Sequence, residues 1–105
     1  MIVIRFKSKN DVCYGLTTSG HAEFDEAGRD IVCAAASVLV INTLNSIEKF
    51  TSDTIEVDEN QEDGRIDATI TSSVSEESQL LFKSLRLGLD GIIKAYGDRY
   101  IKIND

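Results

Sequence analysis

Apolar and polar residues alternate from the start of the chain. Ile2, Ile4 and Phe6 are interleaved with valine, arginine and lysine, and this period of two is typical of a strand with one buried face. An Asn-Asp pair with turn chemistry follows, and the alternation then resumes as far as Gly20. The pattern predicts a β-hairpin over residues 2–19.

A long apolar stretch begins at Ile31 and runs to Glu48. Its eighteen residues exceed the length of a normal strand, and its alanines favour a helix despite several β-branched residues. Asp30 stands just before it and is a good N-cap. Because residues 31–41 are apolar on nearly every side, the helix must be buried on more than one face, by a sheet and either a second helix or another subunit. Residues 20–29 fit neither period and are expected to form a loop.

The second half of the chain repeats the order of strands and helix. Two short alternating segments, 54–58 and 65–70, predict two strands, and the polar segment between them ends in an Asp-Gly turn pair. A second helix is expected to begin near Ser73 or Ser75 and to stop at Gly97. Its apolar positions recur every three or four residues: Leu81, Leu85, Leu89, Ile92 and Tyr96.

A last strand is expected over residues 99–103, which completes the order β-β-α-β-β-α-β. This order predicts an α+β fold, with a mostly antiparallel sheet packed with two helices. At 105 residues the chain is expected to form a single domain, residues 1–105. Its composition, 42% hydrophobic and 28% charged, is that of a globular protein.

Charge and cysteine content narrow the possible functions. Acidic residues outnumber basic ones by 18 to 11, for a net charge of −7. Direct binding of nucleic acid is therefore not expected, since it needs clustered cations. Two cysteines are too few for a disulfide scaffold, and the first apolar run, of four residues, is too short for a signal peptide or a membrane span. We expect reduced thiols and a cytoplasmic location.

His21, the one histidine, and Cys33 are the candidate catalytic residues. If Asp30 caps the helix, Cys33 is the third residue of its first turn, where backbone N–H groups without helical partners and the helix dipole favour a thiolate. A thiol pKa of about 8.5 can fall to ~3.5–7.5 in such a place or beside a protonated imidazole. His21 could then shuttle protons, while the N–H groups of this turn, including that of Cys33, could stabilise an oxyanion.

A purely structural interpretation of both residues stands beside this one. A cysteine in an apolar helix is usually a small core residue, and a histidine in a loop is usually solvated. Cys13 lies in the middle of a predicted strand, away from any helix end, and is expected to be structural.

Three further residues are candidates for supporting roles: Asp30, Ser37 and Gly20, which ends the second predicted strand beside His21. Asp30 either orients His21 and shapes the site or only caps the helix. Ser37 lies four residues after Cys33 and so faces the same side of the helix. It either lines the pocket or bonds back to the carbonyl of Cys33.

The loop over residues 20–29 is a candidate mobile active-site loop, with Ala22, Phe24 and Gly28 as its notable members. Gly28 permits unusual backbone angles, Phe24 can fold over a hydrophobic peptide, and the loop's acidic residues can attract a basic substrate. An ordinary acidic loop explains the same composition equally well. No metal site is expected, because one histidine and two cysteines at unrelated spacings make a weak ligand set and the acidic segment 58–63 lacks the glycine that a calcium loop requires.

The motif formed by residues 20–22 (GHA), residues 28–35 (GRDIVCAA) and Ser37 resembles the signature of the ribosomal-processing cysteine proteases, the Prp family. The family's catalytic cysteine and histidine correspond to Cys33 and His21. The resemblance implies removal of a short N-terminal extension from a large-subunit ribosomal protein (number twenty-seven), by cleavage after a pair of aromatic residues. It also implies a small α/β domain and a cytoplasmic homodimer that needs no metal or cofactor.

The sequence thus yields two hypotheses. In the first, Cys33 attacks the carbonyl that follows an aromatic residue, and His21 acts as base and then as acid in a cysteine endopeptidase. In the second, the protein is a non-enzymatic ribosome-associated interaction module that uses its acidic face and a dimer groove, and both residues are structural.

Overall fold

The computed structural model describes residues 1–20, 27–60 and 64–105, and for 27–30 only the backbone. The elements follow the predicted order: β1 (Ile2–Lys9), β2 (Val12–Ser19), α1 (Ala27–Phe50), β3 (Ile55–Asn60), β4 (Arg65–Ile70), α2 (Glu76–Tyr96) and β5 (Ile101–Asn104). The predicted α+β fold and hairpin are confirmed. The hairpin turns at Asn10 and Asp11, whose φ values of 54° and 65° suit a tight two-residue turn.

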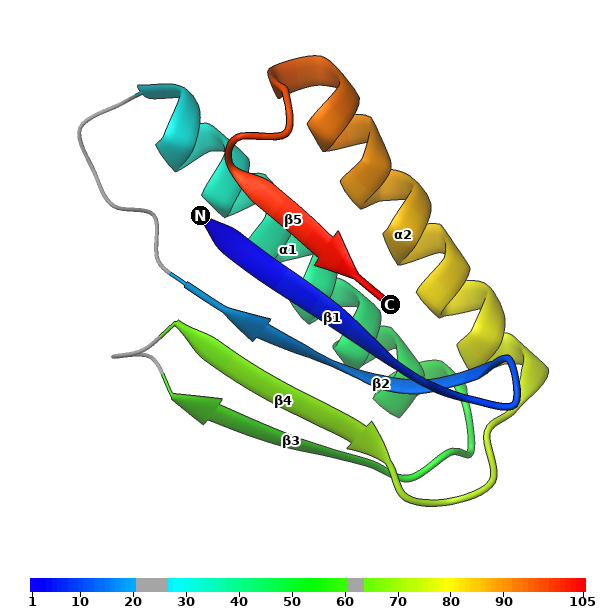
Figure 1. Ribbon diagram of the computed structural model, residues 1–105. Coiled ribbons are helices and arrows are strands. Elements are labelled where there is room, and N and C mark those ends of the chain that lie inside the picture. The colour runs from blue at the N-terminus through cyan, green and yellow to red at the C-terminus, as the bar shows by residue number, and fades with distance from the viewer. Residues whose placement is uncertain (21–26, 61–63) are drawn as a thin grey trace.

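The five strands form one mixed sheet in the order β3-β4-β2-β1-β5. All neighbours are antiparallel except β1 and β5, which run parallel. Both helices cover the same face of this sheet, and in the described part of the chain the opposite face carries no helix (Figure 1). The sheet alternation explains this layering, because the alternate residues of β1 and β2 that face the helices are the apolar ones.

The core lies between the helices and the sheet. Ile4 and Leu16 are fully buried on the sheet side, and Leu89 is fully buried on α2. On α2 the buried positions are Ser78, Phe82, Leu85 and Leu89. This buried stripe is narrower than predicted: Leu81 and Ile92 lie half-buried on its flanks, and Tyr96 is 47% exposed because it lies in the last turn.

The start of α1 differs from the prediction. The helix begins at Ala27, so residues 27–29 of the expected loop are helical and Asp30 is the fourth residue of the helix instead of its N-cap. The physical reason is that alanine and arginine are good helix formers, and an aspartate in the first turn is as favourable to the helix dipole as one at the cap.

The prediction that α1 is covered on more than one face is confirmed in part. The helix packs on the sheet and against α2, where the side chain of Leu39 lies close to Gly88. Ile31 and Val38 nevertheless remain 52% and 66% exposed. Residues 31–50 are long and apolar enough, by length and composition alone, to cross a membrane, a property that they share with the core helices of many folded domains.

Candidate active site

The strand pairing brings four chain segments together at one end of the sheet. β2 and β3 end there, while β1 and β4 begin there. The first half of α1 lies over this end and encloses a cavity of about 430 Å³ with it. Its apolar lining comes mainly from the core residues Ile2, Ile4, Ala36, Val40 and Ile66. The cavity therefore continues the hydrophobic core out to the surface.

Cys33 and Ser37 lie one turn apart on α1, and both line this cavity. The thiol of Cys33 is partly buried, which places it at the wall of the cavity and not within the sealed core. Ser37 faces the same side as predicted and belongs to the cavity lining. The predicted roles of Cys33 as nucleophile and of Ser37 as part of the active-site pocket are compatible with this placement and stay predictions.

Gly20 forms the rim of the cavity at the end of β2. Its φ of 97° lies in the left-handed region, and a Cβ built on it would come within 2.1 Å of the carbonyl oxygen of Met1. Only glycine fits this position without moving the first strand. The predicted catalytic His21 follows it directly in the chain.

Several predicted site residues cannot be placed. His21, Ala22 and Phe24 lie outside the described residues, so the proposed pairing of His21 with Cys33 stays a prediction. Gly28 and Asp30 contribute the backbone of the first turn of α1. The mobile-loop prediction for residues 20–29 is corrected for 27–29, which are helical, and stays a prediction for the remainder.

Because α1 begins earlier than predicted, Cys33 lies further from the first residue of the helix than predicted. Cys33 is the seventh residue of the helix, in its second turn, and not the third residue of the first turn. The four N–H groups without a helical acceptor are therefore those of residues 27–30. The amide of Cys33 itself is within the helical hydrogen-bond pattern, so the prediction that it contributes to an oxyanion hole is wrong.

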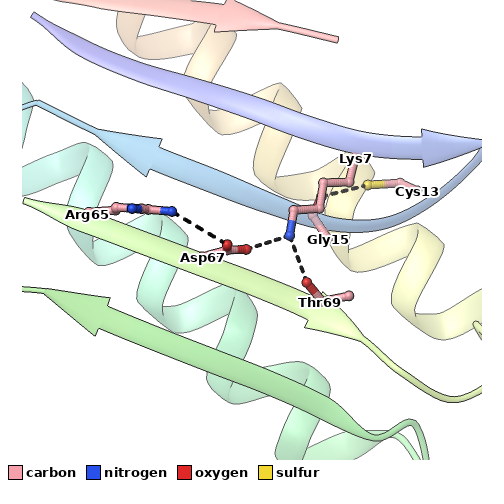
Figure 2. Close-up of polar contacts among 6 residues, drawn as sticks. All are labelled: Lys7, Cys13, Gly15, Arg65, Asp67 and Thr69. Carbon is pink, nitrogen blue, oxygen red and sulfur yellow. Dashed lines mark hydrogen bonds and ion pairs between the residues drawn. The ribbon is translucent and has the colours of Figure 1, made fainter.

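Cys13 provides the expected contrast. Burial is the main cause that raises the pKa of its thiol, outweighing a hydrogen bond from the sulfur to the carbonyl of Gly15, 3.4 Å long (Figure 2). The prediction missed one polar neighbour: Gln79 of α2 accepts from the N–H of Cys13 and donates to its carbonyl. This side chain takes the place of a strand partner just beyond the β2–β4 pairing, which covers Gly15 to Thr18 of β2.

Three polar residues of the cavity rim were not predicted: Glu59, Asn60 and Arg65. Their sequence indicates only a polar turn between two strands. Because β4 pairs with β2, the end of the β3–β4 hairpin at which β3 leads into β4 lies beside Gly20. In the described part of the chain no group of three or more His, Cys, Asp or Glu side chains is arranged to hold a metal ion.

Relatives of known structure and name are similar to this chain over most of its length. The ribosomal processing cysteine protease Prp of Staphylococcus aureus is 29% identical over 85 residues, which cover 81% of this chain and 79% of the relative. The crystal structure of the essential ribosomal processing protease Prp from S. aureus in complex with a substrate peptide matches with a TM-score of 0.88 and 25% identity, over 99% of this chain and 98% of that one. A structure of the same S. aureus protease with a covalently linked product peptide matches with a TM-score of 0.86 and 26% identity, over the same shares.

A family model, that of the cysteine protease Prp, matches residues 1–102. The match covers nearly the whole chain and includes every element that builds the cavity. It confirms the resemblance that the motif around Cys33 predicts. This chain belongs to the cysteine protease Prp family.

Proposed function

We propose that this protein is a cysteine endopeptidase that removes the short N-terminal extension of a ribosomal protein of the large subunit, number twenty-seven, with Cys33 as the nucleophile. The observation that carries the proposal is the placement of the Cys33 thiol in the wall of an open cavity at the end of the sheet. The S. aureus relative with its covalently linked product peptide supports a covalent mechanism. Its description as a ribosomal processing protease supports the substrate class.

In the proposed mechanism the thiolate of Cys33 attacks the carbonyl carbon of the scissile peptide bond and forms a tetrahedral adduct. The adduct collapses as the C–N bond breaks, and His21 gives its proton to the departing amine. The acyl group is then held as a thioester on Cys33. Water gives a proton to His21 while its oxygen attacks the thioester. The C–S bond breaks, which releases the new carboxylic acid and restores the thiolate of Cys33 beside the protonated His21.

The cavity is suited to a bulky apolar side chain on the acyl side of the scissile bond. It is lined mostly by aliphatic residues, and its volume of about 430 Å³ falls in the range of roughly 300–1,000 Å³ that is typical of ligand pockets. An aromatic residue before the scissile bond would bury its ring against Ile4, Val40 and Ile66. This supports the aromatic preference that the family resemblance implies.

The test is incubation of the protein with the extension-bearing ribosomal protein, with mass spectrometry of the products. We expect one cut after an aromatic residue by the wild type, none by Cys33→Ala, and full activity in Cys13→Ala. An intact substrate with wild type, or cleavage that survives Cys33→Ala, would overturn the proposal. Binding of the substrate without cleavage would favour the ribosome-associated interaction module.

We also propose that the protein acts as a homodimer in the cytoplasm. Ile31 and Val38 leave an apolar strip on α1 that neither the sheet nor α2 covers, and such strips often mark interaction sites. Sedimentation velocity should find a dimer that Val38→Glu converts to a monomer. A monomeric wild type, or a dimer that Val38→Glu leaves intact, would count against this part, and cell fractionation tests the location.

A further inference from the structure

The rim of the active-site cavity carries two charged residues, Glu59 and Arg65. They lie at the end of the β3–β4 hairpin where β3 leads into β4, and β3 is the edge strand of the sheet. Whether either charge is available to a substrate depends on which face of the sheet it occupies and on its partners.

Strand register places Glu59 on the helix side of the sheet. Glu59 is paired with Ile66 of β4. Two residues earlier on β3, Val57 is paired with Ala68, which is fully buried. Directly opposed residues of neighbouring strands point to the same face, and alternate residues share it. Glu59 therefore faces the side on which α1, Cys33 and the cavity lie, and α1 leaves Val57 beside it 43% exposed.

Arg65 is engaged on the opposite side. Its guanidinium lies 3.9 Å from the carboxylate of Asp67, which also accepts a hydrogen bond from Lys7, and Lys7 in turn reaches Thr69. Figure 2 shows this network running across β4 and β1 on the face without helices. The guanidinium of Arg65 is thus directed toward the face opposite the helices, where it shares the carboxylate of Asp67 with Lys7. Among the described residues no lysine or arginine forms an ion pair with Glu59, so within that part of the chain its carboxylate has no cationic partner.

We infer that Glu59 is a specificity-determining residue, which binds a lysine or arginine side chain of the peptide substrate close to the scissile bond. This inference rests on the proposed function. The substrate class follows from the two parts of the site: an apolar side chain fills the cavity beside Cys33, and a cationic side chain a few residues away meets Glu59 at the rim. A carboxylate–cation contact at a partly exposed site contributes modestly to binding and weakens with salt.

The experiment is a lysine scan of a quenched fluorescent peptide with one aromatic residue before the scissile bond. At each flanking position a peptide with lysine is compared with a peptide with glutamine. The measured quantity is kcat/KM of the lysine peptide divided by kcat/KM of the glutamine peptide, at low salt. With wild type we expect a ratio of about two to five at one or two neighbouring positions, carried by KM, which corresponds to an exposed or half-exposed ion pair. Glu59→Gln should bring this ratio to about one, and Glu59→Lys should make glutamate preferred at the same position.

Asp58→Asn is the matched control, because it removes the same charge from the next residue of β3, which faces the opposite side of the sheet. Its ratio should equal that of wild type. Raised salt should lower the ratio in wild type and in Asp58→Asn, but not in Glu59→Gln, which lacks the carboxylate. Peptides that are cut with a ratio of one at every position would overturn this inference and leave the protease intact, as would a ratio unchanged by Glu59→Gln. No cleavage of any peptide by wild type would overturn the proposed function as well. Circular dichroism of each variant confirms that it is folded.

Discussion

Removal of one carboxylate, that of Asp53, should destabilise the domain in a way that depends on pH. Asp53 lies in the connection from α1 to β3, and its Oδ2 accepts three hydrogen bonds at the start of α2. They come from the N–H of Ser75 at 2.9 Å, the hydroxyl of Ser75 at 2.8 Å and the hydroxyl of Ser78 at 2.6 Å. Ser75 is the N-cap of α2, and Ser78 is fully buried. Asp53 therefore joins the end of α1 to the start of α2.

The size of the effect follows from these bonds. A hydrogen bond to a charged group contributes about 1.5–3 kcal/mol, but bonds that share one acceptor are not additive and Asp53 is partly exposed. We therefore expect Asp53→Ala to lower the free energy of unfolding by about 2–3 kcal/mol at pH 7, largely because the hydroxyl of Ser78 loses its best acceptor. For a domain of this size that equals a fall in Tm of about 8–20 °C.

The pH dependence provides the sharper test. Burial opposes ionisation of Asp53, but the hydrogen bonds from Ser78 and Ser75 outweigh it and hold the pKa below the ordinary 3.8. A carboxylate with a lowered pKa in the folded state contributes its stability above the pKa of the unfolded chain and loses it as pH falls through the folded value. The difference between wild type and Asp53→Ala should thus be largest at pH 6–7 and shrink below pH 4.

Urea unfolding at several pH values measures this difference directly. Asp58→Ala, which removes an exposed carboxylate of β3, is the control for general charge effects and should change the free energy of unfolding by less than about 0.5 kcal/mol. A difference between wild type and Asp53→Ala that stays constant from pH 7 to pH 3 would refute the assigned role of the charge.

Three further predictions concern single positions. Iodoacetamide near pH 6 should alkylate Cys33 well before Cys13, whose thiol pKa is raised by burial, and peptide mapping that finds equal, slow labelling would contradict an activated Cys33. Gly20→Ala should destabilise the domain by at least about 2 kcal/mol, because its Cβ would collide with the Met1 carbonyl and its φ is positive; a thermal melt like that of wild type would contradict this packing. Gln79→Leu should lower the free energy of unfolding by about 1–3 kcal/mol, because it leaves the backbone N–H and C=O of Cys13 without their partner. A urea midpoint unchanged from wild type would contradict this and show that water replaces the side chain.

Local patterns were sufficient to predict most elements of the fold. The period of two predicted the β1–β2 hairpin, and Ser75 and Gly97 cap the second helix as their residue types suggest. The capping rules gave a wrong helix start for α1, because Asp30 was predicted to be its N-cap. Asp30 satisfies the rule for an N-cap, but it satisfies the rule for a first-turn acid equally well, and nothing in the local sequence distinguishes these two positions.

The rest of the site depends on contacts between distant parts of the sequence. Glu59 lies 26 positions after Cys33 in the chain, and it reaches the cavity only because β4 pairs with β2 and carries β3 with it. The same is true of Gln79, which bonds to a backbone 66 positions away. Periodicity predicts which face of a strand is buried, but it does not predict which strands are neighbours.

The first residue of α1 determines which backbone amides are available to the reaction. With the helix starting at Ala27, the unpaired N–H groups belong to residues 27–30, one turn before Cys33. In a helix each Cα–Cβ bond tilts toward the N-terminus, so the side chain of Cys33 leaves the backbone in the direction of this first turn, while its own amide lies within the helical hydrogen-bond pattern. The start of the helix can therefore stabilise the thiolate only if the Cys33 side chain brings its sulfur close to the N–H groups of the first turn. An oxyanion formed on the attacked carbonyl needs donors other than the amide of Cys33, and the amides of residues 27–30 are the nearest of these along the helix.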